Sequence, residues 1–259
     1  MELYRDYLAS RVVAEGKDLD NYSKVYFKTN EDLVTNFRKV NFDQKRVLSV
    51  LASSDQLFMA RYKGAKRVDC FDQNVLTLYY YYLRIWTIQY TGLVYPEPIL
   101  ENDYQWLNDL LCSVHPTSKE ENDALLFWKK HVEKETKLSN LFFDDFDEGK
   151  TLFRTTNSVK STIPKKLKFQ KLNFFSDIDC SSTYDIVLLS NIIEWARDND
   201  GIIVQVRDNL NRILDNNGLV LCTRLIHHYP QEIAKERRIF EENFSYHELG
   251  SKGYVYCKK

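Results

Sequence analysis

The stretch Arg46-Val-Leu-Ser-Val-Leu-Ala52 decides the fold of this chain. Its apolar run is broken only by Ser49, which is typical of a short strand buried on both faces of a parallel sheet. Ser53-Ser54-Asp55 follows directly and offers N-cap chemistry to a helix that we predict over residues 56–62. Residues 67–72 then repeat the strand pattern. The three elements together predict a right-handed βαβ unit.

The same alternation of strands and helices governs the second half of the chain. Further strands are predicted over 169–175, 184–190, 219–224, 244–249 and 254–258, the last two forming a hairpin around glycines. Further helices are predicted over 75–90, 201–216 and 230–242, with a turn at 216–218. The predicted fold class is therefore α/β, with a doubly wound, mostly parallel seven-stranded sheet and a C-terminal antiparallel hairpin.

Two regions outside this alternation are predicted to be helical. Residues 1–45 form a helical N-terminal extension, with Asn30 as the N-cap of a helix that starts at Glu31. Residues 93–165 form a helical insertion within the sheet-forming part, 46–259. We expect this insertion to cover the edge of the sheet where ligands bind.

The composition excludes several classes of protein. The 259 residues carry 36 basic and 37 acidic side chains, so no overall positive field favours nucleic acid. A polyanion would need a local patch, and the stretch 160–168 is locally basic. Five scattered cysteines without a C-x-x-C pair indicate a reduced, cytoplasmic protein. No Cys/His spacing suits a metal, the start does not resemble a signal peptide, and no apolar run is long enough to cross a membrane.

Polar side chains gather where the predicted strands end. A doubly wound sheet binds its ligand beyond the carboxyl ends of the strands, so these side chains are the candidates for binding and catalysis. In chain order they are Ser53, Ser54, Asp55 and Gln56; Asp72, Gln73 and Asn74; Ser176 and Asp177; Ser190, Asn191 and Glu194; and His227 and His228.

Two of the acids carry the most specific hypotheses. Asp72 ends the second strand about 20 residues after the first loop, where a carboxylate accepts hydrogen bonds from a ribose diol. The alternative is a helix cap, a role that Asn74 also suits. Asp55 either binds an ammonium group or caps its helix. The loop around it contains no glycine, which argues against a diphosphate and suits a ligand without phosphates.

Four stretches together carry a resemblance to a known family. They are Val47-Leu-Ser-Val-Leu-Ala-Ser-Ser-Asp-Gln56, Gly64-Ala-Lys-Arg-Val-Asp-Cys-Phe-Asp-Gln-Asn74, Tyr184-Asp-Ile-Val-Leu-Leu-Ser-Asn-Ile-Ile-Glu194 and Leu210-Asn-Arg-Ile-Leu-Asp-Asn-Asn-Gly-Leu-Val-Leu221. They resemble the class I S-adenosylmethionine-dependent methyltransferases over residues 46–91 and 169–259. The closing hairpin fits the antiparallel last strand of that fold. The resemblance implies a Rossmann-like, S-adenosylmethionine-binding domain over 46–259.

The resemblance also implies where the cofactor lies. It implies the methionine portion near the first loop, the ribose at Asp72, the adenine amino group at Asp177 and the sulfonium beside Ser190 and Asn191. Phe71 or Gln73 would pack on the adenine face. The full set of implied cofactor contacts is Ala52, Ser53, Ser54, Asp55, Gln56, Phe71, Asp72, Gln73, Asn74, Asp177, Ser190 and Asn191.

One departure from the family is plain, because its glycine-rich first loop is missing. The loop Ser53-Ser-Asp-Gln56, with Phe71-Asp-Gln-Asn74 and the run Tyr79–Tyr82, resembles a divergent branch. That branch is similar to the enzymes of betaine-lipid synthesis, which transfer the 3-amino-3-carboxypropyl group of the same cofactor. The lipid substrate of those enzymes is not transferred to this chain.

Transfer from a sulfonium needs alignment more than acid–base chemistry, so a base matters only for a protonated acceptor. The candidates for catalysis are Asn191, Glu194, His227 and His228, with the hydroxyls of Tyr79–Tyr82 as further bases. The histidines are alternatively a solvated pair, and the tyrosines alternatively core. The function predicted first is a methyltransferase with a small-molecule or lipid acceptor. An aminocarboxypropyl transferase, a non-catalytic interaction protein and a nucleotide or dinucleotide enzyme are the alternatives.

Overall fold

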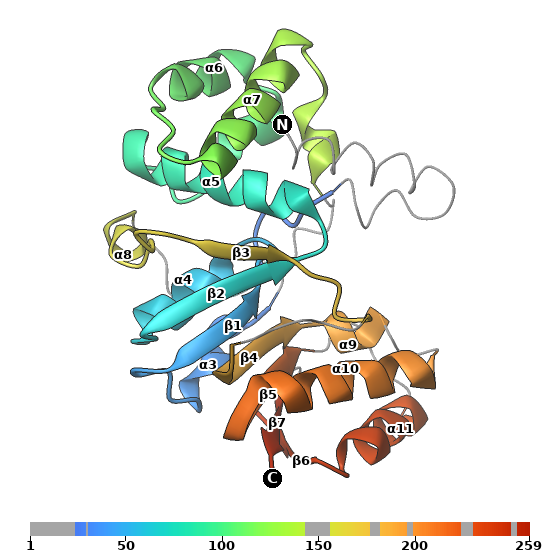
Figure 1. Cartoon of the computed structure of the whole chain (residues 1–259). Coiled ribbons are helices and arrows are strands. Elements are labelled where there is room, and N and C mark those ends of the chain that lie inside the picture. The colour runs from blue at the N-terminus through green and yellow to red at the C-terminus, as the bar shows by residue number, and fades with distance from the viewer. Residues whose placement is uncertain are drawn as a thin grey trace.

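A seven-stranded mixed sheet forms the centre of the protein (Figure 1). The computed structural model describes residues 24–29, 31–142, 156–176, 182–195, 199–223, 230–249 and 253–259. The strands are β1 Arg46–Val50, β2 Arg67–Asp72, β3 Lys168–Lys171, β4 Tyr184–Ser190, β5 Leu214–Thr223, β6 Phe244–Glu248 and β7 Gly253–Lys258. Their order is β3-β2-β1-β4-β5-β7-β6. The first five are parallel and β7 runs antiparallel between β5 and β6, which confirms the predicted fold class.

The central strands are buried on both faces, as their sequences predict. Successive side chains of a strand point to opposite faces. Val47 of β1 therefore packs into the core on one side, while Leu48 and Val50 pack into the core on the other. In β4, Leu188 and Leu189 divide in the same way. This two-sided burial explains why these strands read as continuous apolar runs.

Helices cover both faces of the sheet. On the first face lie α3 Leu33–Arg38, α4 Asp55–Tyr62 and α5 Val75–Tyr90. On the second lie α9 Ile192–Trp195, α10 Asp200–Ile213 and α11 Pro230–Phe240. The connection between β1 and β2 through α4 is the predicted βαβ unit. None of the described helices combines the length and the apolar character needed to cross a bilayer.

The insertion is helical, and it stacks on α5 (Figure 1). Its elements are η1 Glu97–Glu101, α6 Tyr104–Cys112, α7 Lys119–Glu133, η2 Leu138–Leu141 and α8 Thr156–Lys160. Trp128 of α7 donates from its indole nitrogen to the carbonyl oxygen of Tyr79 on α5, at 3.0 Å.

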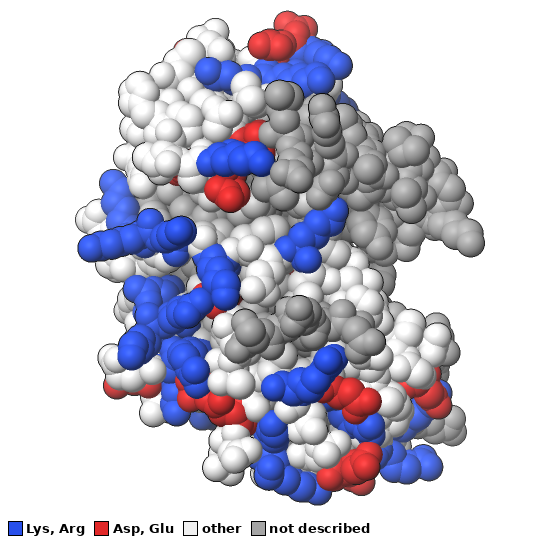
Figure 2. Space-filling model, viewed as in Figure 1, with Lys and Arg blue, Asp and Glu red and all other residues white. Residues whose placement is uncertain are grey.

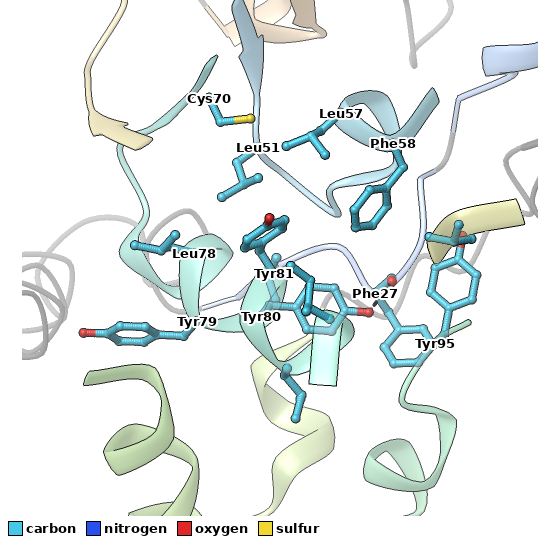
Figure 3. Close-up of a cluster of buried hydrophobic side chains, with 14 of the residues drawn as sticks. Phe27, Leu51, Leu57, Phe58, Cys70, Leu78, Tyr79, Tyr80, Tyr81 and Tyr95 are labelled. Carbon is cyan, nitrogen blue, oxygen red and sulfur yellow. Dashed lines mark hydrogen bonds between the residues drawn. The ribbon is translucent and has the colours of Figure 1, made fainter. Parts of the chain in front are cut away.

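Most of the tyrosine run of α5 belongs to the core. Tyr79, Tyr80 and Tyr81 are fully buried. Figure 3 shows Tyr81 pointing toward Leu51, which follows β1, and Tyr80 pointing toward Phe27. Tyr79 packs instead against Phe127 of α7, with ring centroids 4.9 Å apart. Phe27 reaches the same cluster from the N-terminal segment, and Tyr80 donates to its carbonyl oxygen at 2.5 Å. Three of the four tyrosines therefore belong to the core, which was the alternative to a role as bases.

Several boundaries differ from the prediction, and three of the differences have a local explanation. β3 ends at Lys171 instead of residue 175, because the Asn173 side chain accepts from the Phe175 backbone and starts a turn. The predicted turn at 216–218 lies within β5, at an irregularity in its pairing with β4 where Asn217 is left-handed. The cap of α3 is Asp32, whose carboxylate accepts from the Thr35 backbone, whereas the predicted cap Asn30 lies outside the described residues.

Candidate functional site

A cavity of about 380 Å³ opens at the carboxyl ends of the parallel strands. Its volume is within the range of small-molecule sites. Most of its walls are the segments that follow β1, β2, β3 and β4, and one wall comes from the N-terminal segment. The lining residues are Lys24, Val25, Tyr26, Thr29, Glu31, Val50, Leu51, Ala52, Ser53, Gln56, Phe71, Asp72, Gln73, Asn74, Thr77, Leu172, Asn173, Phe174, Phe175, Ser190, Asn191 and Ile192.

The N-terminal segment, of which residues 24–29 and Glu31 are described, lines the cavity where we expected the helical insertion. The Val25 backbone donates to the carbonyl oxygen of Leu141, and the Asn74 side chain donates to that of Lys24. None of the described residues of the insertion lines the cavity. Residues 24–29 are not helical, so the predicted helical extension is confirmed only for α3.

Asp72 lies at the cavity wall, at the end of β2. Its two carboxylate oxygens accept from the backbone of Ala52, at 3.2 Å, and of Asn74, at 3.0 Å. Burial raises the pKa of Asp72 to about 6, against the lowering effect of these hydrogen bonds. The carboxylate therefore both fixes the first loop and faces the cavity. Its cap role and its ligand role are compatible, because Asn74 is the side chain that caps α5.

The first loop keeps a glycine-like backbone without glycine. Ala52 has φ 39° and Ser54 has φ 71°, both in the left-handed region that non-glycine residues avoid. Each such residue costs roughly 1–2 kcal/mol. Ser190 at the end of β4 is also left-handed, with φ 56°. Strained residues persist where the surrounding structure holds them, and here two of them, Ala52 and Ser190, line the same cavity.

Asp55 turns away from the cavity and into the protein. It is the first residue of α4 and pairs with Arg84 of α5 at 3.1 Å, with both side chains fully buried. It also accepts from the Tyr95 hydroxyl at 2.9 Å and from the Thr29 backbone at 2.8 Å. Neither Asp55 nor Ser54 lines the cavity. The structure gives Asp55 a protein cation as its partner, not the ammonium group of a ligand.

Glu31 is the acid that faces this part of the cavity. Its residue exposure is 5%, and it accepts from the Gln56 amide at 2.8 Å and from the Ser190 hydroxyl. Burial raises the pKa of Glu31 above its ordinary value, while the hydrogen bonds from Ser190 and Gln56 lower it. No ion pair links Glu31 to a cation within the described part of the chain. The site therefore holds a buried carboxylate that suits a positively charged group of a ligand.

Aromatic side chains form the wall opposite the first loop. Phe71 of β2 packs against Phe174, with ring centroids 4.7 Å apart. Phe175 and Asn173 follow β3 and line the same wall. A flat heteroaromatic ring fits beside such side chains, and Gln73 adds a polar group there.

The structure brings most of the predicted site residues together. Ala52, Ser53, Gln56, Phe71, Asp72, Gln73, Asn74, Ser190 and Asn191 all line the cavity. Asp177, His227 and His228 lie outside the described residues, and so does the side chain of Glu194. None of Tyr79–Tyr82 lines the cavity. Within the described ranges, no three His, Cys, Asp or Glu side chains form a cluster that could hold a metal ion.

Sequence reasoning missed the contribution of residues that are distant in the chain. Glu31, Tyr26 and Lys24 precede the first strand, and no local pattern connects them with strand ends. A sequence signal existed for Leu172–Phe175, which lay in the segment predicted as a strand.

Comparisons with known proteins give distant structural likenesses only. No family model matches the chain, and no curated protein matches its sequence. A methyltransferase from Pyrococcus furiosus aligns over 99% of this chain and 98% of its own, with 9% identity and a TM-score of 0.47. A TehB-like SAM-dependent methyltransferase from Corynebacterium glutamicum covers 100% and 98%, with 9% identity and a TM-score of 0.41. The ribosomal protein L11 methylase of Lactobacillus delbrueckii covers 88% and 76%, with 12% identity and a TM-score of 0.41. Likenesses this distant leave the activity of this chain to be argued from its own site.

The strain in the first loop predicts a stabilising substitution. Ser54 is left-handed, and its buried hydroxyl has no hydrogen-bond partner among the described residues. Ser54→Gly removes both costs, so we expect the free energy of unfolding to rise by about 1 kcal/mol in a denaturant titration. Ser54→Ala removes only the hydroxyl and should gain less. A glycine variant less stable than the alanine variant would contradict the role of backbone strain.

The buried ion pair predicts a strongly destabilising substitution. Arg84→Met leaves the Asp55 carboxylate buried without its cation, so we expect a loss of about 3–5 kcal/mol in unfolding free energy. Lys235→Ala breaks an exposed pair with Asp200 and should cost less than about 1 kcal/mol. Equal losses in the two variants would show that burial does not decide the strength of the first pair.

Proposed function

We propose that the protein is an S-adenosylmethionine-dependent transferase, and specifically a methyltransferase. The observation that carries the proposal is the Asp72 carboxylate, which ends β2 and faces a cavity at the carboxyl ends of β1, β2 and β4. An acid at this position of a doubly wound sheet suits a ribose diol. The resemblance of the sequence to the class I methyltransferases supports the same cofactor.

The rest of the cavity suits the remaining parts of that cofactor. The adenine would lie along the wall of Phe71 and Phe174, next to the ribose at Asp72. The methionine portion, with its sulfonium and ammonium charges, would extend toward Glu31, Gln56 and Ser190. The left-handed first loop bends the chain as a glycine loop would, while its side chains leave less room for a diphosphate.

The chemistry follows from orientation. Bound S-adenosylmethionine supplies an activated methyl group whose transfer leaves a neutral thioether, so no acid is needed. Ser190 and Asn191 would hold the reacting end in line with the acceptor, and alignment of this kind supplies much of the rate. Burial raises the pKa of Glu31, so its carboxylate would be a stronger base than that of an exposed acid. It would therefore suit the removal of a proton from a protonated acceptor.

Calorimetry and product analysis test the proposal. Binding of S-adenosylmethionine and S-adenosylhomocysteine, without binding of NAD, supports it. Mass spectrometry of the spent cofactor then separates the reactions, because methyl transfer yields S-adenosylhomocysteine and aminocarboxypropyl transfer yields methylthioadenosine. Binding of none of these ligands would favour a non-catalytic interaction protein.

The ribose role proposed for Asp72 predicts that Asp72→Asn weakens cofactor binding. The variant removes the charge that would accept both ribose hydroxyls, so we expect the dissociation constant for S-adenosylmethionine to rise at least tenfold, about 1.4 kcal/mol. Asp43→Asn, an exposed acid away from the cavity, is the matched control and should bind normally. Unchanged affinity in a folded Asp72→Asn variant would reject the ribose role.

The raised pKa of Asp72, about 6, predicts a pH dependence of binding. Ribose hydroxyls donate to the ionised carboxylate and so bind the deprotonated form better, which lowers its pKa in the complex. Affinity should therefore be full above pH 7 and fall as the pH drops through about 6, by up to tenfold per unit. In Asp72→Asn the affinity should fall less as the pH drops. Any dependence on pH that remains would come from the protonation of Glu31. An identical profile in both proteins would contradict the assignment.

Glu31→Gln separates a binding role from a structural role. The amide keeps the approximate shape but removes a buried charge, so the free protein should be as stable as before or more stable. S-adenosylmethionine should bind about tenfold more weakly, since its cationic end loses a carboxylate. S-adenosylhomocysteine has the same ammonium group but no sulfonium charge. A similar loss of affinity for it would assign Glu31 to the ammonium group, and a smaller loss would assign Glu31 to the sulfonium. A destabilised variant with normal affinity would contradict the prediction.

A further inference from the structure

One edge of the sheet carries a concentration of positive charge that the cofactor cavity does not use. Residues 156–176 contain five lysines and no acidic residue, in a chain whose net charge is −1. We define the basic edge as Lys66, Arg67, Lys160, Lys165, Lys166 and Lys168, all of which are exposed. Figure 2 shows Lys and Arg side chains running from α8 along the side of the molecule where β3 and β2 lie.

The fold brings these residues together from two segments. β3 pairs in parallel with β2, with Lys168 opposite Asp69, and α8 contacts α4, so the connections that lead into β2 and β3 lie side by side. Arg67 and Lys168 share the buried carboxylate of Asp69 beneath the surface, at 2.7 and 3.7 Å. Lys66, Lys160, Lys165 and Lys166 form no ion pair with any described residue. Their charges therefore face solvent.

The basic edge lies at the amino ends of β2 and β3, and β3 connects it to the cavity at the carboxyl ends of the strands. Lys171 ends β3 and is followed by Leu172–Phe175, which line the cavity. At the same opening lie Lys24 and Tyr26, and both Tyr26 and Phe175 are half-buried. Cations followed by accessible aromatic rings are the combination that binds a phosphate backbone and stacks its bases.

From these observations we infer that the protein binds single-stranded nucleic acid along the basic edge, with one base presented at the cavity. The part of this inference that makes the strand the acceptor rests on the proposed function. The N-terminal segment partly closes the cavity that would hold the cofactor, so a single base, and not a duplex, would approach the reacting end. The even overall balance of charge is no obstacle, because a phosphate chain responds to local cations.

A membrane surface is the less suitable partner. Interfacial binding needs apolar side chains that enter the lipid beside the basic ones. The large exposed apolar side chains of the described residues are Tyr62, Tyr90 and Leu126. Tyr62 ends α4 and Tyr90 ends α5, the two helices that contact α8, so two single tyrosines are the large exposed apolar side chains of the elements that border the basic edge.

The test measures binding of a short fluorescent single-stranded RNA by anisotropy at several salt concentrations. The variant K160E/K165E/K166E should bind at least tenfold more weakly, and its slope of log affinity against log salt should fall by roughly 2. The variant K129E/K134E/K137E changes three exposed lysines of the insertion equally and should bind like the unmodified protein. Equal binding by all three proteins, or no binding, overturns the inference.

Two further measurements keep the inference separate from the proposed function. Vesicles containing phosphatidylserine serve as the second probe, and binding of vesicles in place of RNA overturns the inference. Calorimetry with S-adenosylmethionine should give the same affinity for the basic-edge variant and the unmodified protein, while transfer of labelled methyl to RNA should be lost only in the variant. If the protein binds RNA but not the cofactor, the inference that the basic edge binds nucleic acid stands and the proposed function is rejected.

Discussion

The buried pair of Asp55 and Arg84 is the interaction on which the rest of the site depends. Asp55 receives hydrogen bonds from Thr29 and Tyr95, and Arg84 donates to the carbonyl oxygen of Ser53. The pair thereby joins the N-terminal segment, the first loop, α5 and the start of the insertion. Two buried charges of this kind are tolerated because each compensates the charge of the other. The left-handed turn of the first loop and the position of the N-terminal segment both follow from this contact.

The sequence predicted the sheet well because its strands are buried on both faces. Such strands need continuous apolar residues, and the runs at β1, β2 and β4 were recognisable without any partner. The prediction was wrong where a local pattern was weaker than the tertiary contacts. Residues 216–218 have turn chemistry and a left-handed Asn217, yet the chain continues as the same strand because its far end pairs with β7.

The position of the site was predictable from the sequence, but the roles of its charged residues were not. Strand ends identified nine of the cavity residues, because parallel strands bring their carboxyl ends to one edge. Asp55 was expected either to bind an ammonium group or to cap its helix, but Arg84, 29 positions later in the chain, neutralises it. Glu31 lies before the first strand, and its partner Ser190 is 159 positions away. No rule based on sequence spacing connects residues so far apart in the chain. The missing glycines were likewise misleading, since Ala52 and Ser54 adopt the glycine conformation themselves.

The long separation of Glu31 and Ser190 has a consequence for biosynthesis. A growing chain emerges with its N-terminus first, so residues 24–31 leave the ribosome well before β4 exists to receive them. The binding pocket is complete only once most of the polypeptide has been made. A small molecule that occupies it would lower the free energy of finished chains alone, in proportion to the logarithm of its concentration. The concentration of that molecule would then influence what fraction of the finished chains is folded.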